Sequence, residues 1–163
     1  MNNNLKFRTE IPEWEFPCEI NHQTPLFFIG SCFADNISGK LQFYKFPVIS
    51  NPFGTLYNPA SVFNVLKAIE TKSVPENLLL HKNELWLHYY FHSSVKNTSK
   101  TDFIQNFKKL SQKLSKHLSE TKVAFITLGT SYVYELQNVI VGNCHKQPAS
   151  LFTHRLLTLK ETV

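Results

Sequence analysis

The stretch Leu26-Phe27-Phe28-Ile29-Gly30-Ser31-Cys32-Phe33-Ala34-Asp35 decides the fold of this chain. Its first four residues form a short, continuous apolar run, which is typical of a strand buried on both faces, as in a parallel sheet. Beyond Gly30 the apolar period changes, because Phe33, Ile37 and Leu41 recur at the spacing of one helix face. The stretch therefore predicts a buried strand, a Gly-Ser turn and a helix that starts near residue 32.

The rest of the chain continues this alternation of strands and helices. A second buried strand is expected at residues 123–128, again followed by glycine, and a shorter one at 46–49. Asn58 before Pro59 predicts the start of a helix, and Ser99 with Asp102 predicts another. The expected apolar stripes of these helices are Val62, Phe63, Leu66 and Ile69, and Phe103, Phe107, Leu110, Leu114 and Leu118. Hairpins are expected around Lys82-Asn83 and Gln137-Asn138.

This order of segments predicts an α/β domain with a mostly parallel sheet, doubly wound in three layers as in flavodoxin-like folds. Only about three strands of a central parallel sheet can be recognised, whereas about five to six are usual. A capping box, Thr158-Leu159-Lys160-Glu161, comes just before the last residues. We therefore expect residues 1–163 to be the N-terminal portion of one truncated domain, whose missing C-terminal half would be its partner.

Composition and charge exclude several classes of protein. The net charge of +5 is modest, and Lys109, Lys113 and Lys116 share one helix face, which favours a solvated surface over a nucleic-acid site. Three cysteines without a Cys-x-x-Cys motif indicate a reducing compartment rather than a disulfide framework. No apolar run approaches the length of a membrane span, and no apolar signal core is present near residue 1. We expect a cytoplasmic protein without nucleic-acid or membrane partners.

Both expected buried strands end in glycine and hydroxyl residues, Gly30-Ser31-Cys32 and Gly129-Thr130-Ser131. Ligand sites of open α/β sheets form at these strand ends. A serine that also opens a helix lies beside unpaired backbone N–H groups, which can stabilise an oxyanion. Such a serine can equally be a helix cap, and Cys32 could itself be a nucleophile or a small core residue. Position alone leaves these alternatives open.

The residues from Phe28 to Asp35 resemble the signature of the GSCFA family, which is grouped with the SGNH, or GDSL-like, hydrolases. Three further blocks resemble that family in the same order along the chain. They are Asn51-Pro52-Phe53-Gly54-Thr55-Leu56-Tyr57-Asn58-Pro59, Thr127-Leu128-Gly129-Thr130-Ser131 and Asn143-Cys144-His145-Lys146-Gln147-Pro148-Ala149-Ser150.

The resemblance implies a serine ester hydrolase that acts through an acyl-enzyme on a small-molecule or glycan ester, and that needs no metal or organic cofactor. Ser31 would be the nucleophile. The oxyanion hole would use the N–H groups of Ser31, Cys32 and Gly54, with Ser131 where related enzymes have asparagine. Residues that could line the site are Asn51, Gly129, Thr130 and His145.

The resemblance also implies a general base that the sequence lacks. Related hydrolases carry a late Asp-x-x-His, but Asp35 and Asp102 are the only aspartates and neither has histidine three residues on. His145 could be a substitute base or a loop residue. His88 and His92 are expected on one face of a probable hairpin, four residues apart, where they could form a metal pair, yet no carboxylate or cysteine nearby completes the site. We therefore expect the chain to be inactive as given, and the alternative is a non-catalytic binding or structural domain.

Overall fold

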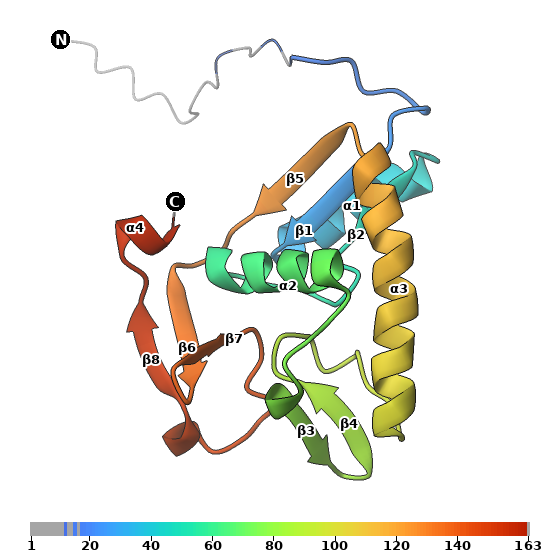
Figure 1. Cartoon of the computed structure of the whole chain (residues 1–163). Helices are drawn as coiled ribbons and strands as arrows, with labels where there is room; N and C mark the ends of the chain where they lie inside the picture. Colours follow the sequence, from blue (N-terminus) through green and yellow to red (C-terminus); the bar gives the residue numbers. More distant parts are fainter. Residues whose placement is uncertain (1–11, 13–14, 16, 163) are drawn as a thin grey trace, which may run out of the picture.

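The computed structural model describes residues 12, 15 and 17–162. At its centre lies a parallel sheet of order β2-β1-β5, formed by β1 (Leu26–Gly30), β2 (Val48–Ser50) and β5 (Val123–Thr127). Helix α1 (Cys32–Phe43) packs on one face of β1 (Figure 1). Helices α2 (Pro59–Thr71) and α3 (Lys100–Glu120) pack on the other.

Two antiparallel sheets complete the fold of the described residues. One is the hairpin of β3 (Leu79–Lys82) and β4 (Leu85–His88), and the other has the order β7-β6-β8. Its strands are β6 (Tyr132–Leu136), β7 (Val139–Val141) and β8 (Thr153–Leu156), and a short helix α4 (Leu159–Thr162) follows. Two 3₁₀ turns, Glu76–Leu78 and Ala149–Leu151, precede β3 and β8. Both predicted hairpins are confirmed, whereas the expected mostly parallel sheet accounts for only three of these strands.

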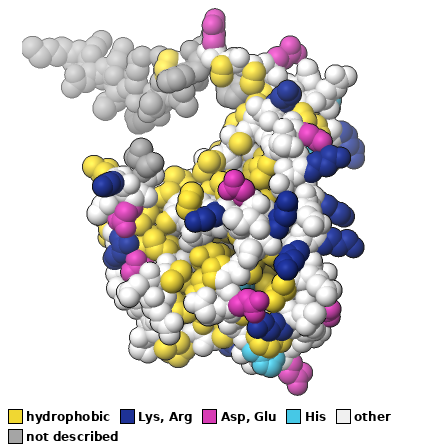
Figure 2. Space-filling model, viewed as in Figure 1, with side chains coloured by type: hydrophobic (Ala, Val, Ile, Leu, Met, Phe, Trp, Pro, Cys, Tyr) yellow, Lys and Arg dark blue, Asp and Glu magenta, His cyan; other side chains and the backbone are white. Residues whose placement is uncertain are grey.

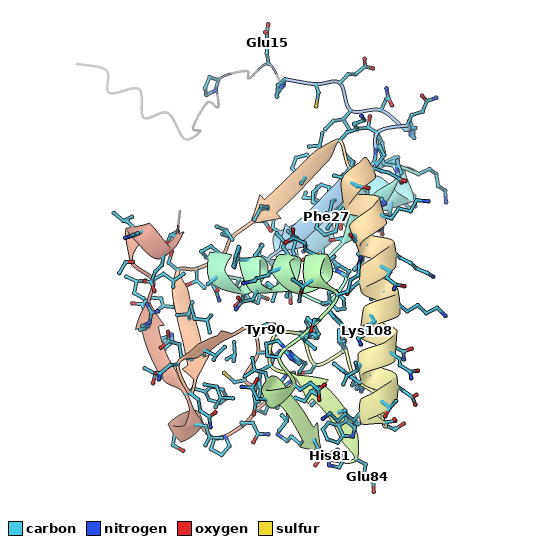
Figure 3. All side chains as sticks on the ribbon, viewed as in Figure 1. Glu15, Phe27, His81, Glu84, Tyr90 and Lys108 are labelled. Atoms are coloured by element: carbon cyan, nitrogen blue, oxygen red, sulfur yellow. The ribbon has the colours of Figure 1, made fainter. Side chains whose placement is uncertain are left out.

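Strand β1 is the buried centre of the molecule, as its sequence predicts. All five of its residues are buried. Leu26 and Phe28 contact Ala34 of α1 in one apolar cluster, while Phe27 and Ile29 belong to the larger cluster built with α2 and α3. Figure 3 shows Phe27 on the side of the sheet where these two helices lie. A strand covered on both faces needs apolar residues at every position, which explains the unbroken run.

Three predicted helix starts are confirmed by side-chain caps. Asn58 Oδ1 accepts the Ser61 N–H at 2.8 Å, and Ser99 Oγ accepts the Asp102 N–H at 3.3 Å. At α4 the box is reciprocal, because Thr158 Oγ1 accepts the Glu161 N–H while the Glu161 carboxylate accepts the Thr158 N–H. These bonds satisfy N–H groups that a helix cannot pair internally.

The structure corrects four predictions about burial. Phe33, Phe63 and Leu110 were expected on apolar stripes that face the core, but 61%, 62% and 37% of their surfaces are exposed. In α1 the small residues Ala34 and Ser38 face β1 instead, since the short turn brings the helix close to the strand. Strand β5 was expected to be buried, yet alternate residues such as Ile126 are exposed, because only the face that carries Val123 and Phe125 packs on the cluster with α1.

The surface of α3 agrees with the expected solvated face. Lys109, Lys113 and Lys116 are all exposed, and Figure 2 shows basic side chains along this edge of the molecule.

Within the described part of the chain, no helix combines the length and apolar character that a membrane span needs.

Gly30 allows β5 to approach the end of β1 more closely than any other residue would. Its φ is +132°, outside the region that residues with a side chain favour. A Cβ at this position would overlap the carbonyl oxygen of Thr127, the residue paired with Gly30 in the parallel register. The end of the central strand therefore requires glycine for both its backbone angle and its neighbour.

We predict that Gly30→Ala lowers the free energy of unfolding by about 3 kcal/mol or more, because both the φ angle and the contact with backbone are unfavourable. Urea unfolding measures the change. The matched control is Gly39→Ala in α1, where an added Cβ meets nothing within 4 Å and should stabilise by about 0.5–1 kcal/mol. Equal effects of the two substitutions would contradict the close approach at Gly30.

His88, at the end of β4, is a fully buried histidine whose ring bonds to two backbone groups. Its Nε2 lies 3.0 Å from the Pro75 carbonyl oxygen, and its Nδ1 accepts the Tyr90 N–H at 3.1 Å. An Nδ1 that accepts is unprotonated, so the ring is the neutral Nε2–H tautomer. Burial lowers the pKa of His88 to about 4, against the hydrogen bond to Pro75, which raises it.

A lowered pKa makes stability depend on pH. Above about pH 6.5 both folded and unfolded states hold His88 neutral, and its contribution to stability is complete. Below pH 6.5 the unfolded state binds the proton first. We therefore expect the free energy of unfolding to decrease by roughly 3 kcal/mol between about pH 6.5 and pH 4. Urea unfolding as a function of pH measures this loss. His88→Gln should flatten the profile, whereas His81→Gln, at an exposed position of the same hairpin, should leave it unchanged. A wild-type profile that is flat across this range would contradict the buried, neutral state of His88.

Candidate active site

Ser31 lies where the central strand ends and α1 begins, and its side chain does not cap the helix. Only 8% of its surface is exposed, and as the N-cap residue it makes no side-chain bond to the first turn. Its Oγ instead lies 3.0 Å from Thr127 Oγ1, at the end of β5. The interpretation of Ser31 as a helix cap is therefore not supported, and its hydroxyl faces the neighbouring strand.

Two of the expected oxyanion donors are already paired. The Ser31 N–H donates to the Thr127 carbonyl oxygen at 2.9 Å and to Thr127 Oγ1 at 3.0 Å. The Gly54 N–H donates to the Asn51 carbonyl oxygen at 2.8 Å and closes a turn. An N–H group has a single proton, so in this arrangement neither group is free to bind a substrate oxygen. Both assignments stay predictions, and each would require the N–H group to exchange its present acceptor for a substrate oxygen.

The free donors lie in the first turn of α1. Among the described residues, the N–H groups of Cys32 and Phe33 have no acceptor, as expected at a helix start. They point out of a twelve-residue helix whose dipole favours negative charge at this end. The expected donor Cys32 is therefore available, and Phe33 is a donor that the sequence analysis missed. The general rule that a helix leaves its first N–H groups unpaired could have identified it.

Asn51 holds the strand end rather than lining an open surface. It is buried, its Oδ1 accepts the Gly30 N–H at 2.8 Å, and its Nδ2 donates to Asp35 Oδ1 at 2.8 Å. Asp35 Oδ1 also accepts a bond from Ser50 Oγ at 3.0 Å. Through these hydrogen bonds, the amide side chain of Asn51 connects β1, α1 and the segment after β2. Asp35 was not predicted for this role, although it stands one helical turn beyond Ser31.

Gly129 and Tyr57 bring the second and third sequence blocks to Ser31. The Tyr57 carbonyl oxygen accepts the N–H groups of Gly129 and Thr130 at 2.8 and 3.0 Å. A Cβ on Gly129 would lie 3.2 Å from Tyr57 Cδ1 and 3.8 Å from Ser31 Cβ. Gly129 therefore lies beside Ser31, and the partly exposed ring of Tyr57 contacts Gly129. The structure confirms that these blocks converge, and Tyr57 is a further neighbour that the sequence did not indicate.

Thr130 and Ser131 follow at the start of β6. Thr130 Oγ1 accepts the Tyr132 N–H at 3.0 Å, so its hydroxyl stabilises the turn into that strand. The Ser131 carbonyl oxygen accepts the Leu157 N–H at 2.9 Å. The Ser131 hydroxyl has no hydrogen-bond partner within the described ranges, and its role as an oxyanion donor stays a prediction.

His145 belongs to a separate, buried cluster. Its Nδ1 lies 3.0 Å from Ser93 Oγ and its Nε2 lies 3.0 Å from the His88 carbonyl oxygen. Lys82 Nζ donates to the carbonyl oxygens of His145 and Lys146, which holds the loop. Burial lowers the pKa of His145. Because both ring nitrogens are engaged here, the structure does not bring His145 to Ser31 as a base, and it supports the alternative of a loop residue.

The described residues place no group beside Ser31 Oγ that could take the serine proton. Among the described residues, Thr127 is the hydrogen-bond partner of Ser31 Oγ, and no imidazole or carboxylate contacts that atom. No group of three or more metal-ligating side chains gathers in the described part of the chain either, and His92 Nδ1 is paired with Ser94 instead. Among the described residues, the geometry therefore brings a serine hydroxyl next to two unpaired N–H groups, without a neighbouring base.

Comparisons with known proteins agree with the sequence blocks that converge here. No curated protein and no solved structure matches the chain. The model of the GSCFA family matches residues 25–163, from the start of the central strand onwards, and includes all four blocks. The chain belongs to the GSCFA family.

Proposed function

We propose that this chain carries the nucleophile of a serine ester hydrolase of the SGNH type, on a three-layer, doubly wound α/β fold. The observation that carries the proposal is the position of Ser31. It lies at the carboxyl end of a buried parallel strand and at the N-terminus of a helix with two free N–H groups. This is the edge of a parallel sheet where ligands bind, and the nucleophile and the donors share one rigid turn.

In the proposed reaction, Ser31 Oγ attacks the ester carbonyl carbon and a C–O bond forms. The serine proton passes to a base that the described residues do not provide, and the Cys32 and Phe33 N–H groups stabilise the oxyanion. The tetrahedral intermediate then releases the alcohol and leaves an acyl-enzyme, which water hydrolyses. This acyl transfer needs no metal or organic cofactor. Without the base, the serine hydroxyl is a poor nucleophile at neutral pH, so the described residues alone should react slowly.

The exposed ring of Tyr57 beside the site of Ser31 favours an ester with an apolar or ring-shaped part. Tyr57 lies next to Gly129 at the site and is 46% exposed, and Phe33 stands two residues after Ser31 with its side chain in solvent. Large exposed apolar side chains that gather at one place often mark a binding site. We propose a small-molecule ester or an acyl or acetyl ester of a glycan as the substrate. The cytoplasmic location, the lack of nucleic-acid and membrane partners, and the missing C-terminal half stay predictions.

The alternative is a domain that binds a ligand at this site without chemistry. It is favoured by the pairing of the Ser31 N–H and by the hydroxyl, rather than a base, that contacts Ser31 Oγ. In that case the exposed rings would bind the ligand and Ser31 would be a structural residue.

We predict that Ser31→Ala in the protein of the full reading frame lowers the rate of p-nitrophenyl acetate hydrolysis by at least about a hundredfold, the scale of losing a catalytic group. Cys32→Ala, which removes the exposed neighbouring thiol but keeps its N–H, is the matched control and should retain most of the rate. A rate that falls in Cys32→Ala and not in Ser31→Ala would assign the chemistry to the thiol. Equal, near-background rates in all three proteins would favour the binding domain.

A further inference from the structure

Thr127 is the residue that contacts the proposed nucleophile most closely. It ends β5, and its hydroxyl meets Ser31 twice, at the N–H and at Oγ, both at 3.0 Å. Its carbonyl oxygen accepts the same N–H at 2.9 Å. We propose that Thr127 is a positioning residue, whose hydroxyl fixes the direction in which Ser31 presents its proton. The proposal rests on the proposed function and names a residue that the sequence analysis did not assign.

The direction of one of the two bonds follows from what each group can donate. The Ser31 N–H can only donate, so Thr127 Oγ1 accepts at that contact. At the contact between the two hydroxyls either oxygen can donate, and the proposal assigns the donor role to Thr127, whose proton the first bond leaves available. If Thr127 donates to Ser31 Oγ, the Ser31 proton cannot point back at Thr127. It is therefore directed away from β5 and is available to a base.

The position of Thr127 is set by backbone rather than by a flexible side chain. Gly30 pairs with Thr127 in the parallel register, and the missing Cβ of Gly30 lets the two backbones touch. Thr127 is β-branched and half-buried, which restricts its side-chain rotamers. Its hydroxyl is thus held at a fixed place beside Ser31 before any substrate binds.

Loss of the Thr127 hydroxyl should leave the Ser31 backbone in place, but the direction of the Ser31 Oγ–H bond would no longer be fixed. Ser31 Oγ would then rotate between positions, and only some of them would present the proton to a base. Misplacing a reacting group by about 1 Å can cost on the order of a hundredfold in rate. We therefore expect a change in the reactivity of Ser31 rather than a loss of folding.

A fluorophosphonate probe measures that reactivity without depending on the natural substrate. In the labelling step a bond forms between Ser31 Oγ and phosphorus, the P–F bond breaks, fluoride leaves, and the serine proton passes to the base that the proposed function requires and from there to the solvent. The rate is followed by intact mass, and peptide mapping identifies the labelled residue. The proteins compared are the wild type, Thr127→Val, Thr127→Ser and Ser31→Ala, each made from the full reading frame.

Valine has the shape of threonine without the hydroxyl, and serine keeps the hydroxyl on a smaller side chain. We expect Thr127→Val to label at least about tenfold more slowly than the wild type with an unchanged urea midpoint. We expect Thr127→Ser to label within about threefold of the wild type, which a purely structural role of the side chain would not predict.

The outcomes distinguish the proposed role of Thr127 from the proposed role of Ser31 as nucleophile. If the wild type is labelled at Ser31 and Thr127→Val reacts equally fast, the role of Thr127 is refuted while the nucleophile stands. If Thr127→Ser is as slow as Thr127→Val, shape rather than the hydroxyl matters, and the role is also refuted. If Ser31→Ala is labelled like the wild type, or the wild type is not labelled, the proposed function fails and the role of Thr127 falls with it.

Discussion

The contact between Gly30 and the end of β5 is the constraint on which the site depends. Because Gly30 has no Cβ, the Thr127 backbone reaches the last residue of the central strand, and the Ser31 N–H can donate to the Thr127 carbonyl oxygen. The same approach places the Thr127 hydroxyl beside Ser31 Oγ. A residue with a side chain at position 30 would push the strands apart and separate these two groups.

The other interactions at the site extend this contact. Asn51 binds the Gly30 N–H from the opposite side and connects it to Asp35 in α1, and Tyr57 holds the segment of Gly129 against Ser31. The Gly30-Ser31 turn is therefore held by two segments, residues 51–57 and 127–129, that are far from each other in sequence. Such a rigid arrangement suits a nucleophile, since its geometry is set before the substrate binds. It also pairs the Ser31 and Gly54 N–H groups, so the unpaired N–H groups beside Ser31 are those of the first turn of α1.

Local patterns in the sequence predicted where helices and strands begin, but they did not always predict which face of an element is buried. The apolar run before Gly30 predicted the central strand, and the caps at Asn58, Ser99 and Thr158 predicted three helix starts, because these signals act within a few residues. Phe33 was misplaced because helical spacing identifies a face only to within about one residue, and here Ala34 allows the closer contact with β1. The antiparallel strand β8 lacks a local signal, since its pairing with β6 is a tertiary contact.

The same distinction applies to the site. The Gly-Ser turn and the order of the blocks indicated Ser31, Gly129 and Asn51, but Thr127, Asp35 and Tyr57 act through distances that no sequence spacing reveals. The central claim, that β5 holds the Ser31 N–H, is tested most directly by amide hydrogen exchange measured by NMR. The account predicts that the Ser31 amide exchanges at least about a hundredfold more slowly than the unpaired Cys32 amide, after correction for intrinsic rates. Exchange of Ser31 as fast as that of Cys32 would contradict it.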